Sequence, residues 1–313
     1  MDYFIVSLLN GLIYGLLLFM VSAGLTLVFG MMGILNFAHA SFYMLGAYAA
    51  YALQPVIGFW WAVVVATVLV GGVGVVTERY FLRPVHKYGH AHELLLTFGL
   101  SFIIAELVKL FFGNYPVNYR VPQALSFSAF HVGPSAYPFY RLLIGLVAIA
   151  MFVLIYLLLT RTRVGIIVRA AIRRPAMAGA LGHNVPVVFM AVFGVGAALA
   201  GLAGAIAGAF YTTSPNMAIE LAVMMFVVVV IGGLGSLEGA LLASLIIGLS
   251  TSFSVGVDVS LAQVLAYVGM GDWARGIGGL LTLKLSSLSG TIPYALMLLV
   301  LLIRPYGLMG AKE

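Results

Sequence analysis

The sequence of 313 residues contains no cysteine and very few charged side chains. Without cysteine, a disulfide framework, a thiol nucleophile and a cysteine-ligated metal site are all excluded. Charged residues make up 8% of the chain, whereas an average soluble domain is about one quarter charged. A chain so poor in charge cannot present a wettable surface, so a soluble globular fold is excluded as well.

Apolar residues dominate the composition instead. They make up 63% of the chain, and the mean hydropathy is +1.16. The run from Phe4 to Phe29 has no charged side chain and is long enough to cross a bilayer. It lacks a basic start and is too long for a cleavable signal peptide. The sequence therefore predicts an all-α polytopic membrane protein, a bundle of about eight or nine transmembrane helices with broken helices. The expected spans are 4–30, 38–53, 59–77, 93–112, 140–160, 187–210, 221–233, 238–255 and 290–303.

Two connecting loops are basic. The first runs from Arg79 to Lys87, and the second carries Arg161, Arg163, Arg169, Arg173 and Arg174 with no acidic residue before Glu220. Short Lys/Arg-rich loops stay on the cytoplasmic side, and two spans separate these loops, so both lie on that side. The C-terminal Arg304 and Lys312 join them, which puts the N-terminus outside for nine crossings or inside for eight. We interpret the net charge of +6 as a topology signal and expect no nucleic-acid binding.

The opposite side carries a loop, residues 113–138, rich in aromatic residues and proline. It suits either a landing surface for an extracytoplasmic partner or an aromatic belt without a partner. Residues 254–289 are less apolar, and we expect a partly interfacial segment there with a short helix.

Small residues define one central span. Gly196, Ala200, Gly204 and Gly208 recur every four residues, a spacing that lets helix backbones approach closely in a membrane. This pattern predicts a span at the centre of the bundle, through close packing alone or through contact with cargo.

Two polar, glycine-rich stretches interrupt long apolar runs. One spans residues 29–41 and the other residues 231–239. Paired discontinuities mark a path or gate in transporters, because unwound backbone needs a cavity or protein around it. The alternative is a tight cytoplasmic turn, which we favour for the second stretch. The helix-break candidates are Gly30, Gly33, Gly232, Gly233, Gly235 and Ser236, and the candidates for lining a substrate path are Asn36, His39, Ser41 and Glu106.

These stretches also carry a family resemblance. Gly24 to Gly30, Asn36 to His39, Leu45 to Tyr48, Ile231 to Ala240 and Ile303 to Gly310 resemble the integral-membrane permeases of branched-chain amino acid ABC transporters. The resemblance covers nearly the whole chain in order, which implies a single permease domain over residues 1–313 in the bacterial inner membrane.

The resemblance gives the second basic loop a role. Residues 161–186 are similar to the family's cytoplasmic coupling loop, whose short helix docks into a groove on a cytosolic ATPase. The coupling candidates that it implies are Arg169, Ala171, Ala178, Leu181, Gly182 and Asn184. A short helix of small residues suits a groove, and Gly182 can end it.

The resemblance further implies a transport subunit without its own ATPase site. None of the lysines follows a glycine, so the Gly-Lys of a phosphate loop is absent and no cofactor is expected. The expected partners are a second related permease, cytosolic ATPase subunits that use ATP, an extracytoplasmic solute-binding protein, a small-molecule substrate and membrane lipid.

Three other functions remain open. An ABC permease for urea or short amides differs only in cargo. An ion-coupled secondary carrier needs mid-membrane carboxylates, and Glu106, which Lys109 follows at i+3, is the nearest one; a structural ion pair of these two is the alternative. An intramembrane aspartyl protease would use Asp272 with Asp258.

One cluster has the spacing of a metal site: His86, His90, His92 and Glu93. Leu96 stands where a zinc-protease helix needs histidine, however, and we expect no metal.

Overall fold

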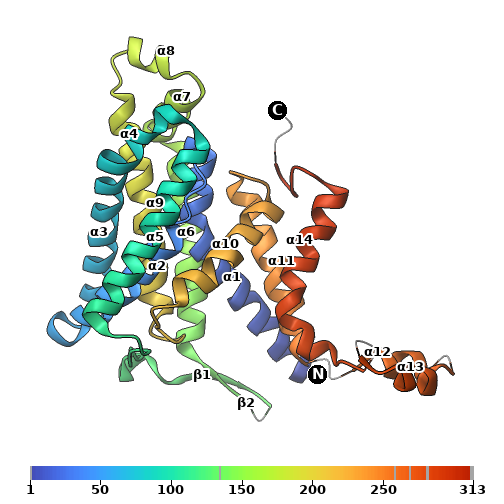
Figure 1. Cartoon of the computed structure of the whole chain (residues 1–313). Helices are drawn as coiled ribbons and strands as arrows, with labels where there is room; N and C mark the ends of the chain where they lie inside the picture. The colour runs from blue at the N-terminus through green and yellow to red at the C-terminus, as the bar shows by residue number, and fades with distance from the viewer. Residues whose placement is uncertain (1, 134, 257–258, 268, 280–281, 311–313) are drawn as a thin grey trace.

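The computed structural model describes residues 2–133, 135–256, 259–267, 269–279 and 282–310. Within them, long helices run side by side and form a bundle with two ends (Figure 1). The helices that match the predicted spans are α1 (Asp2–Met32), α2 (His39–Ile57), α3 (Phe59–Thr77), α5 (His90–Phe112), α6 (Phe139–Arg161), α9 (Val185–Ala207), α10 (Met217–Gly232), α11 (Leu237–Gly256) and α14 (Ile292–Ile303). The predicted all-α membrane bundle is confirmed.

Seven of the helical segments in the described part of the chain are long and apolar enough to span a bilayer. To these α2 adds 19 residues, and α10 is a shorter apolar helix of 16. Counted together, nine of the described helices correspond to the nine predicted spans. Accordingly, α1 starts at one end of the bundle and α14 finishes at the other (Figure 1).

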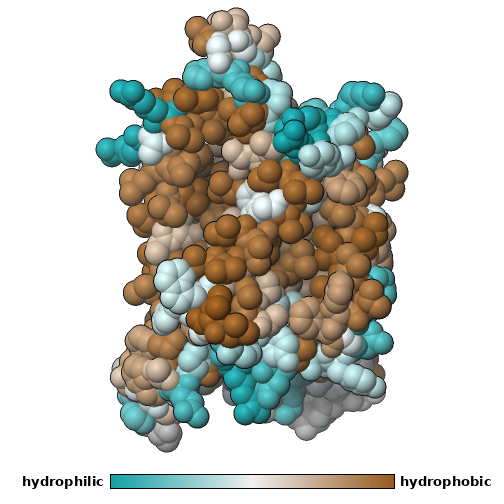
Figure 2. Space-filling model, turned by 90° about the vertical axis from the view of Figure 1, so that its left-hand side faces the viewer, coloured by the Kyte–Doolittle hydropathy of each residue, from teal (hydrophilic) through white to brown (hydrophobic). Residues whose placement is uncertain are grey.

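The outer surface has the pattern that a bilayer demands. A broad hydrophobic band covers the middle of the face seen in Figure 2, with hydrophilic residues above and below it. Helices α3 and α5 carry exposed apolar side chains, such as Val68 and Leu110. In water such a surface would be unstable, whereas in lipid it is matched to its surroundings.

Both basic loops lie at the same end of the bundle, as predicted (Figure 1). The first contains a π-helical turn, η1 (Glu78–Leu82), followed by α4 (Arg83–Val85) and η2 (His86–Tyr88). The second contains α7 (Arg163–Arg173) and α8 (Pro175–Ala180). By the positive-inside rule this end is cytoplasmic, and the first residues of α1 are therefore on the outside.

The opposite end holds the predicted aromatic loop and the less apolar segment. The loop contains η3 (Gln123–Leu125) and an antiparallel hairpin of β1 (Ser128–Val132) and β2 (Ser135–Pro138). It is tied to the bundle because the Tyr119 hydroxyl donates to the Ala205 carbonyl at 2.7 Å. The less apolar segment contains two short helices, α12 (Leu261–Ala266) and α13 (Gly271–Ile277), and then η5 (Leu285–Thr291).

The small-residue span α9 lies at the centre of the bundle, as its spacing predicts. It packs against α1, α2 and α3. A Cβ atom added at Gly204 would overlap the Tyr43 carbonyl of α2, and one at Gly196 would press on Val28 of α1. Glycine at these positions therefore sets the distance between the helix backbones.

The second glycine-rich stretch is a tight turn at the cytoplasmic end. It joins α10 to α11 through Gly233 and Gly235, both with positive φ, and Ser236 caps α11 by accepting from the Gly239 amide. The tail that follows α14 closes this turn. Leu308 and Met309 donate their amides to the Ile231 and Gly232 carbonyls at 2.8 and 3.0 Å. These bonds satisfy carbonyl groups that a helix end otherwise leaves without partners.

Candidate functional site

The first glycine-rich stretch differs from the second because it folds back into the bundle. Helix α1 ends at Met32, and residues 33–38 return as non-helical chain before α2 begins at His39. The His39 imidazole lies against Gly24, eight residues before the end of α1 and thus about 12 Å inside it. We call residues 33–38 the buried break.

Helix α5 holds the buried break in place. The Phe37 amide donates to the Thr97 hydroxyl at 3.2 Å, and Thr97 is itself buried. The Ser41 hydroxyl lies 3.5 Å from the Ser101 carbonyl of the same helix. The backbone of the break therefore finds partners on protein, as irregular chain inside a membrane must.

The structure brings together three of the predicted path residues at this break. Asn36, His39 and Ser41 are each 1% exposed. The Asn36 side-chain oxygen accepts from the Ala38 amide at 3.0 Å, but its Nδ2 and both ring nitrogens of His39 make no hydrogen bond to any described residue. Polar atoms buried without partners are costly, and three of the six such side-chain atoms among the described residues lie at this break.

Glu106 is not part of this group. Its side chain is 68% exposed on the outer face of α5 and pairs with Lys109 at 2.7 Å. The structural ion pair, the alternative that the i+3 spacing offered, is thus the arrangement found. A helix as apolar all round as α5 gives no pattern that separates its inner from its outer face.

The loop of residues 161–186, which the sequence predicts to couple to an ATPase and which we call the coupling loop, projects beyond the rest of the cytoplasmic end (Figure 1). Its two short helices are held differently. In α7, Ala171 is fully buried and Arg169 donates to the Leu159 carbonyl at the end of α6. In α8, Ala178 is buried, while Met177 and, just past the helix end, Leu181 (77% exposed) point outward. The loop thus presents two apolar side chains, four residues apart, at its tip.

Gly182 ends α8, as its sequence position predicts. Its φ is +86°, a region where residues with side chains are strained. The His183 amide donates to the Ala178 carbonyl and the Gly182 amide to the Gly179 carbonyl, each at 3.0 Å. This pair of bonds is the Schellman arrangement that closes a helix with glycine. Asn184 then starts α9, because its side-chain oxygen accepts from the Val187 amide at 3.3 Å.

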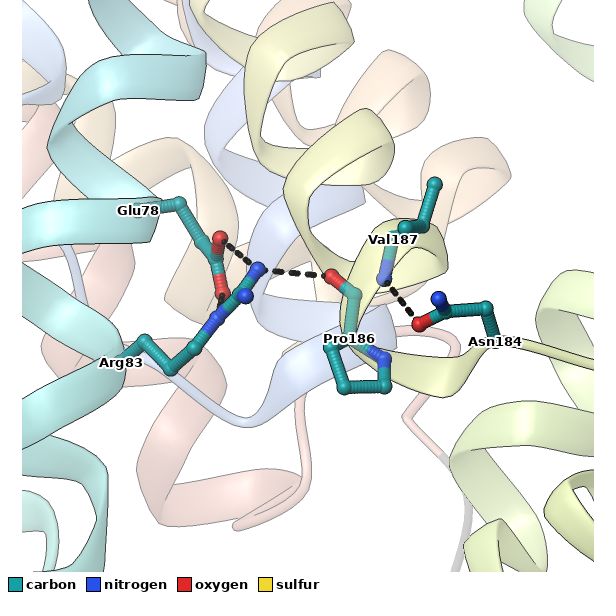
Figure 3. Close-up of polar contacts among 5 residues, drawn as sticks. All are labelled: Glu78, Arg83, Asn184, Pro186 and Val187. Atoms are coloured by element: carbon teal, nitrogen blue, oxygen red, sulfur yellow. Dashed lines mark hydrogen bonds and ion pairs between the residues drawn. The ribbon is translucent and has the colours of Figure 1, made fainter.

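Arg83 ties the first basic loop to the end of the coupling loop (Figure 3). Its guanidinium donates to both oxygens of Glu78, at 3.2 and 2.7 Å, and to the Pro186 carbonyl at 2.9 Å. Glu78 is 3% exposed, so its charge is stabilised mainly by this bidentate pair. We call Arg83, Glu78 and the Pro186 carbonyl the arginine clasp. Sequence reasoning missed it, because Arg83 and Pro186 are 103 residues apart.

A cavity of about 130 Å³ lies beside the arginine clasp. Its lining residues come from the end of α1, the buried break, the first basic loop and the start of α9: Met32, Ile34, Glu78, Leu82, Arg83, His86, Val185, Pro186 and Phe189. The break and the coupling loop therefore meet at one place.

Two histidines, His86 of the first basic loop and His90 at the start of α5, contact a second buried carboxylate. Glu93 is 1% exposed, and its two oxygens contact Nδ1 of His86 and, at 3.1 Å, Nδ1 of His90. In the described part of the chain, neither this group nor any other set of three His, Asp or Glu side chains is arranged so that it could hold a metal ion. The group therefore fixes the start of α5 against the first basic loop.

Of the two aspartates weighed for protease chemistry, Asp272 lies in α13 at the outer end and Asp258 lies outside the described residues.

Comparisons with known proteins match this architecture along its length. A family described as "Branched-chain amino acid transport system / permease component" matches residues 7–301. The high-affinity branched-chain amino acid transport system permease protein LivH of Escherichia coli K12 is 27% identical, with 99% of this chain and 97% of that protein covered. BraD of Pseudomonas aeruginosa is 26% identical, with 99% of this chain and 97% of that protein covered. A probable LivH of Methanocaldococcus jannaschii is 29% identical, with 96% of this chain and 91% of that protein covered. No solved structure gives a significant match.

Proposed function

The chain belongs to the family of branched-chain amino acid transport permeases, and from this premise we propose that it forms part of the membrane pore of an ABC importer for branched-chain amino acids. Its relatives LivH and BraD are permease proteins of high-affinity branched-chain amino acid transport systems, and the match spans both chains almost completely. The protein resides in the cytoplasmic membrane with the two basic loops inside. ATP hydrolysis belongs to separate cytosolic subunits, and a second permease and a solute-binding protein complete the importer.

The observation that carries the proposal is the route from the coupling loop to the buried break. An ATPase subunit that binds Met177 and Leu181 displaces α8 as a rigid body when it changes conformation. The Schellman closure at Gly182 and the cap at Asn184 make the connection to α9 short and stiff. The arginine clasp then passes the displacement to the first basic loop and to the cavity at Ile34. Such coupling requires an element with two arrangements, whose equilibrium is shifted both by the ATPase at the coupling loop and by the substrate at the buried break.

Within this scheme, Asn36, His39 and Ser41 line the path in at least one transport state. The three unpartnered nitrogens support this role, because a permanently closed core would be more stable with apolar side chains there. A path with neutral amide, imidazole and hydroxyl groups suits a small zwitterion with an aliphatic side chain. Glu106 lies outside this path, on the outer face of α5.

Purification of the chain from its native membrane in mild detergent, followed by reconstitution with its co-purifying subunits, tests the function. We expect ATPase subunits and a second permease to accompany the chain, and ATP-dependent uptake of leucine into proteoliposomes. Uptake of urea in preference to leucine would assign the cargo to amides. A chain that is purified alone and moves solute without ATP would identify a secondary carrier instead.

The docking surface has its own test. Leu181→Glu places a charge at the tip of the coupling loop, so the co-purified ATPase should be lost while the membrane chain remains. Tyr115→Glu is the matched control, since Tyr115 is 84% exposed in the loop at the outer end, where no cytosolic subunit reaches. Equal recovery of the ATPase with both variants would exclude Leu181 from the contact.

A further inference from the structure

A second cavity, distinct from the one at the arginine clasp, opens at the outer end of the bundle. It has a volume of about 460 Å³ and lies between the first turns of α1, the start of α6, the loop after α9 and the last turn of α11. Its lining residues are Tyr3, Val6, Ser7, Asn10, Ile13, Tyr14, Arg141, Tyr211, Thr251, Ser252, Val255 and Gly256. Eight of these carry a hydroxyl, amide or guanidinium group, whereas most of the bundle surface is apolar.

Arg141 is the charged group of this cavity. It is half-buried, its guanidinium donates to the Asn10 side-chain oxygen at 2.6 Å, and its Cζ lies 5.1 Å from the centroid of the Phe210 ring. Among the carboxylates whose side chains the structure describes, none forms an ion pair with Arg141. A guanidinium has five N–H donors in a planar fork that matches a carboxylate, and only part of this capacity is used here.

Neutral polar groups stand around the guanidinium. Tyr14 and Tyr211 bring phenolic hydroxyls to the lining, and the buried Thr251 hydroxyl makes no hydrogen bond to any described residue. Burial raises the pKa of Tyr211 above its ordinary value of 10, although Arg141 acts in the opposite direction, so this phenol is a neutral donor at physiological pH. Among the side chains that line the cavity, donors are therefore available to an anion and none is a carboxylate.

The same cavity has an aliphatic wall. Val6, Ile13 and Val255 line it together with the polar groups. A ligand that fits both parts has a carboxylate at one end and a short apolar side chain at the other. An inorganic anion would use only the polar part, and an apolar molecule would leave the guanidinium without its matching partner.

We propose that this outer cavity binds a small amino acid with an aliphatic side chain, with Arg141 receiving its α-carboxylate. The site would hold the solute at the outer mouth before it reaches the buried break. This inference rests on the proposed transport function, because it assigns the entry site for the same solute. It places the selection for a free carboxylate on the permease itself.

Chemical modification of arginine tests binding directly. The purified complex is treated with phenylglyoxal, with and without leucine, and the extent of labelling at each arginine is measured by mass spectrometry. Leucine should slow labelling of Arg141, whereas leucinamide, which lacks the carboxylate, should not. Arg120 is the control within the same sample, since it is an outer-loop arginine that also pairs with an asparagine, Asn118, at 2.6 Å and does not line the cavity. Equal protection by leucine and leucinamide, or better protection by inorganic phosphate than by leucine, would overturn the proposal.

Uptake by reconstituted complexes separates this inference from the function on which it rests. Arg141→Gln should raise the leucine concentration for half-maximal uptake by about tenfold, because a charge-assisted hydrogen bond is lost. Arg120→Gln should leave it unchanged. A wild-type complex that takes up no leucine contradicts the transport function. A wild-type complex that takes up leucine, with an Arg141→Gln variant indistinguishable from it, contradicts the outer site alone.

Discussion

Arg83 and the Pro186 carbonyl are joined at 2.9 Å across the cytoplasmic face, so the first basic loop and the end of the coupling loop are physically one unit (Figure 3). The same guanidinium neutralises the buried Glu78. A single side chain therefore serves both stability and communication. The two roles can be separated by experiment.

Loss of the arginine clasp should uncouple transport and also destabilise the fold. Arg83→Gln leaves Glu78 as an unpaired buried charge, which typically costs about 3–5 kcal/mol. The double variant Glu78→Gln with Arg83→Gln removes that charge, so the melting temperature in detergent should recover. Uptake should stay low in both, because the bond to Pro186 is still absent.

Arg79→Gln is the matched control for these variants. Arg79 lies in the same loop and stacks on its neighbour Tyr80, with no contact to the coupling loop among the described interactions. Normal uptake by the double variant would show that the clasp is structural only.

The coupling loop should depend on the backbone conformation of residue 182 rather than on the space around it. Nothing lies within 4 Å of a Cβ atom placed at Gly182, but its φ is +86°. Asparagine tolerates this region and valine does not. Gly182→Asn should therefore support uptake, whereas Gly182→Val should reduce it at least about tenfold with normal membrane insertion, because the connection between α8 and α9 is misdirected. Equal uptake by the two variants would refute the role of the Gly182 conformation in coupling α8 to α9.

Gly24 should be the most sensitive glycine near the buried break. A Cβ atom there would overlap the Gly196 carbonyl and lie 2.8 Å from two atoms of the His39 imidazole. Overpacking of this kind costs about 1–3 kcal/mol, so Gly24→Ala should lower the melting temperature of the purified chain. Gly72→Ala is the comparison, since nothing lies within 4 Å of its Cβ position. A melting temperature that does not distinguish the two variants would contradict this packing.

The absence of native cysteine makes access to the path directly measurable. Asn36→Cys and His39→Cys should react with a small polar thiol reagent during ATP-driven turnover and be protected without ATP. Ser244→Cys provides the packing control, because Ser244 is fully buried in α11 and bonded to the Leu241 carbonyl of its own helix. If cysteines 36 and 39 stay as unreactive as the control in every transport state, these residues serve packing alone.

The sequence predicts the spans well because the physics that forms them is local. Each predicted span lies within a few residues of an observed helix, since about 20 apolar residues form a helix wherever they meet lipid. The packing role of Gly196 and Gly204 is also local, because spacing alone brings them onto one face. The end of α8 at Gly182 follows from the special φ of one residue.

Other features depend on contacts between distant segments, which a pattern does not record. The depth of the buried break is set by the hydrogen bond to Thr97 of α5 and by the packing of His39 against Gly24 of α1. The clasp needs a π-helical turn to bring Arg83 onto Glu78, five residues away, where a regular α-helix aligns residues three or four apart. Arg141 was not singled out from the sequence at all, because a lone arginine at a span end ordinarily marks only the membrane surface.

The odd number of passes between α1 and α14 limits how two such chains can be combined. The start of α1 and the end of α14 lie at opposite ends of the bundle (Figure 1). A tandem gene fusion of two parallel copies of this segment would therefore need either an added span in its linker or a linker that crosses the bilayer. A pore made of two such segments in the same orientation is most simply built from separate polypeptides, whose stoichiometry is set by association in the membrane rather than by covalent linkage.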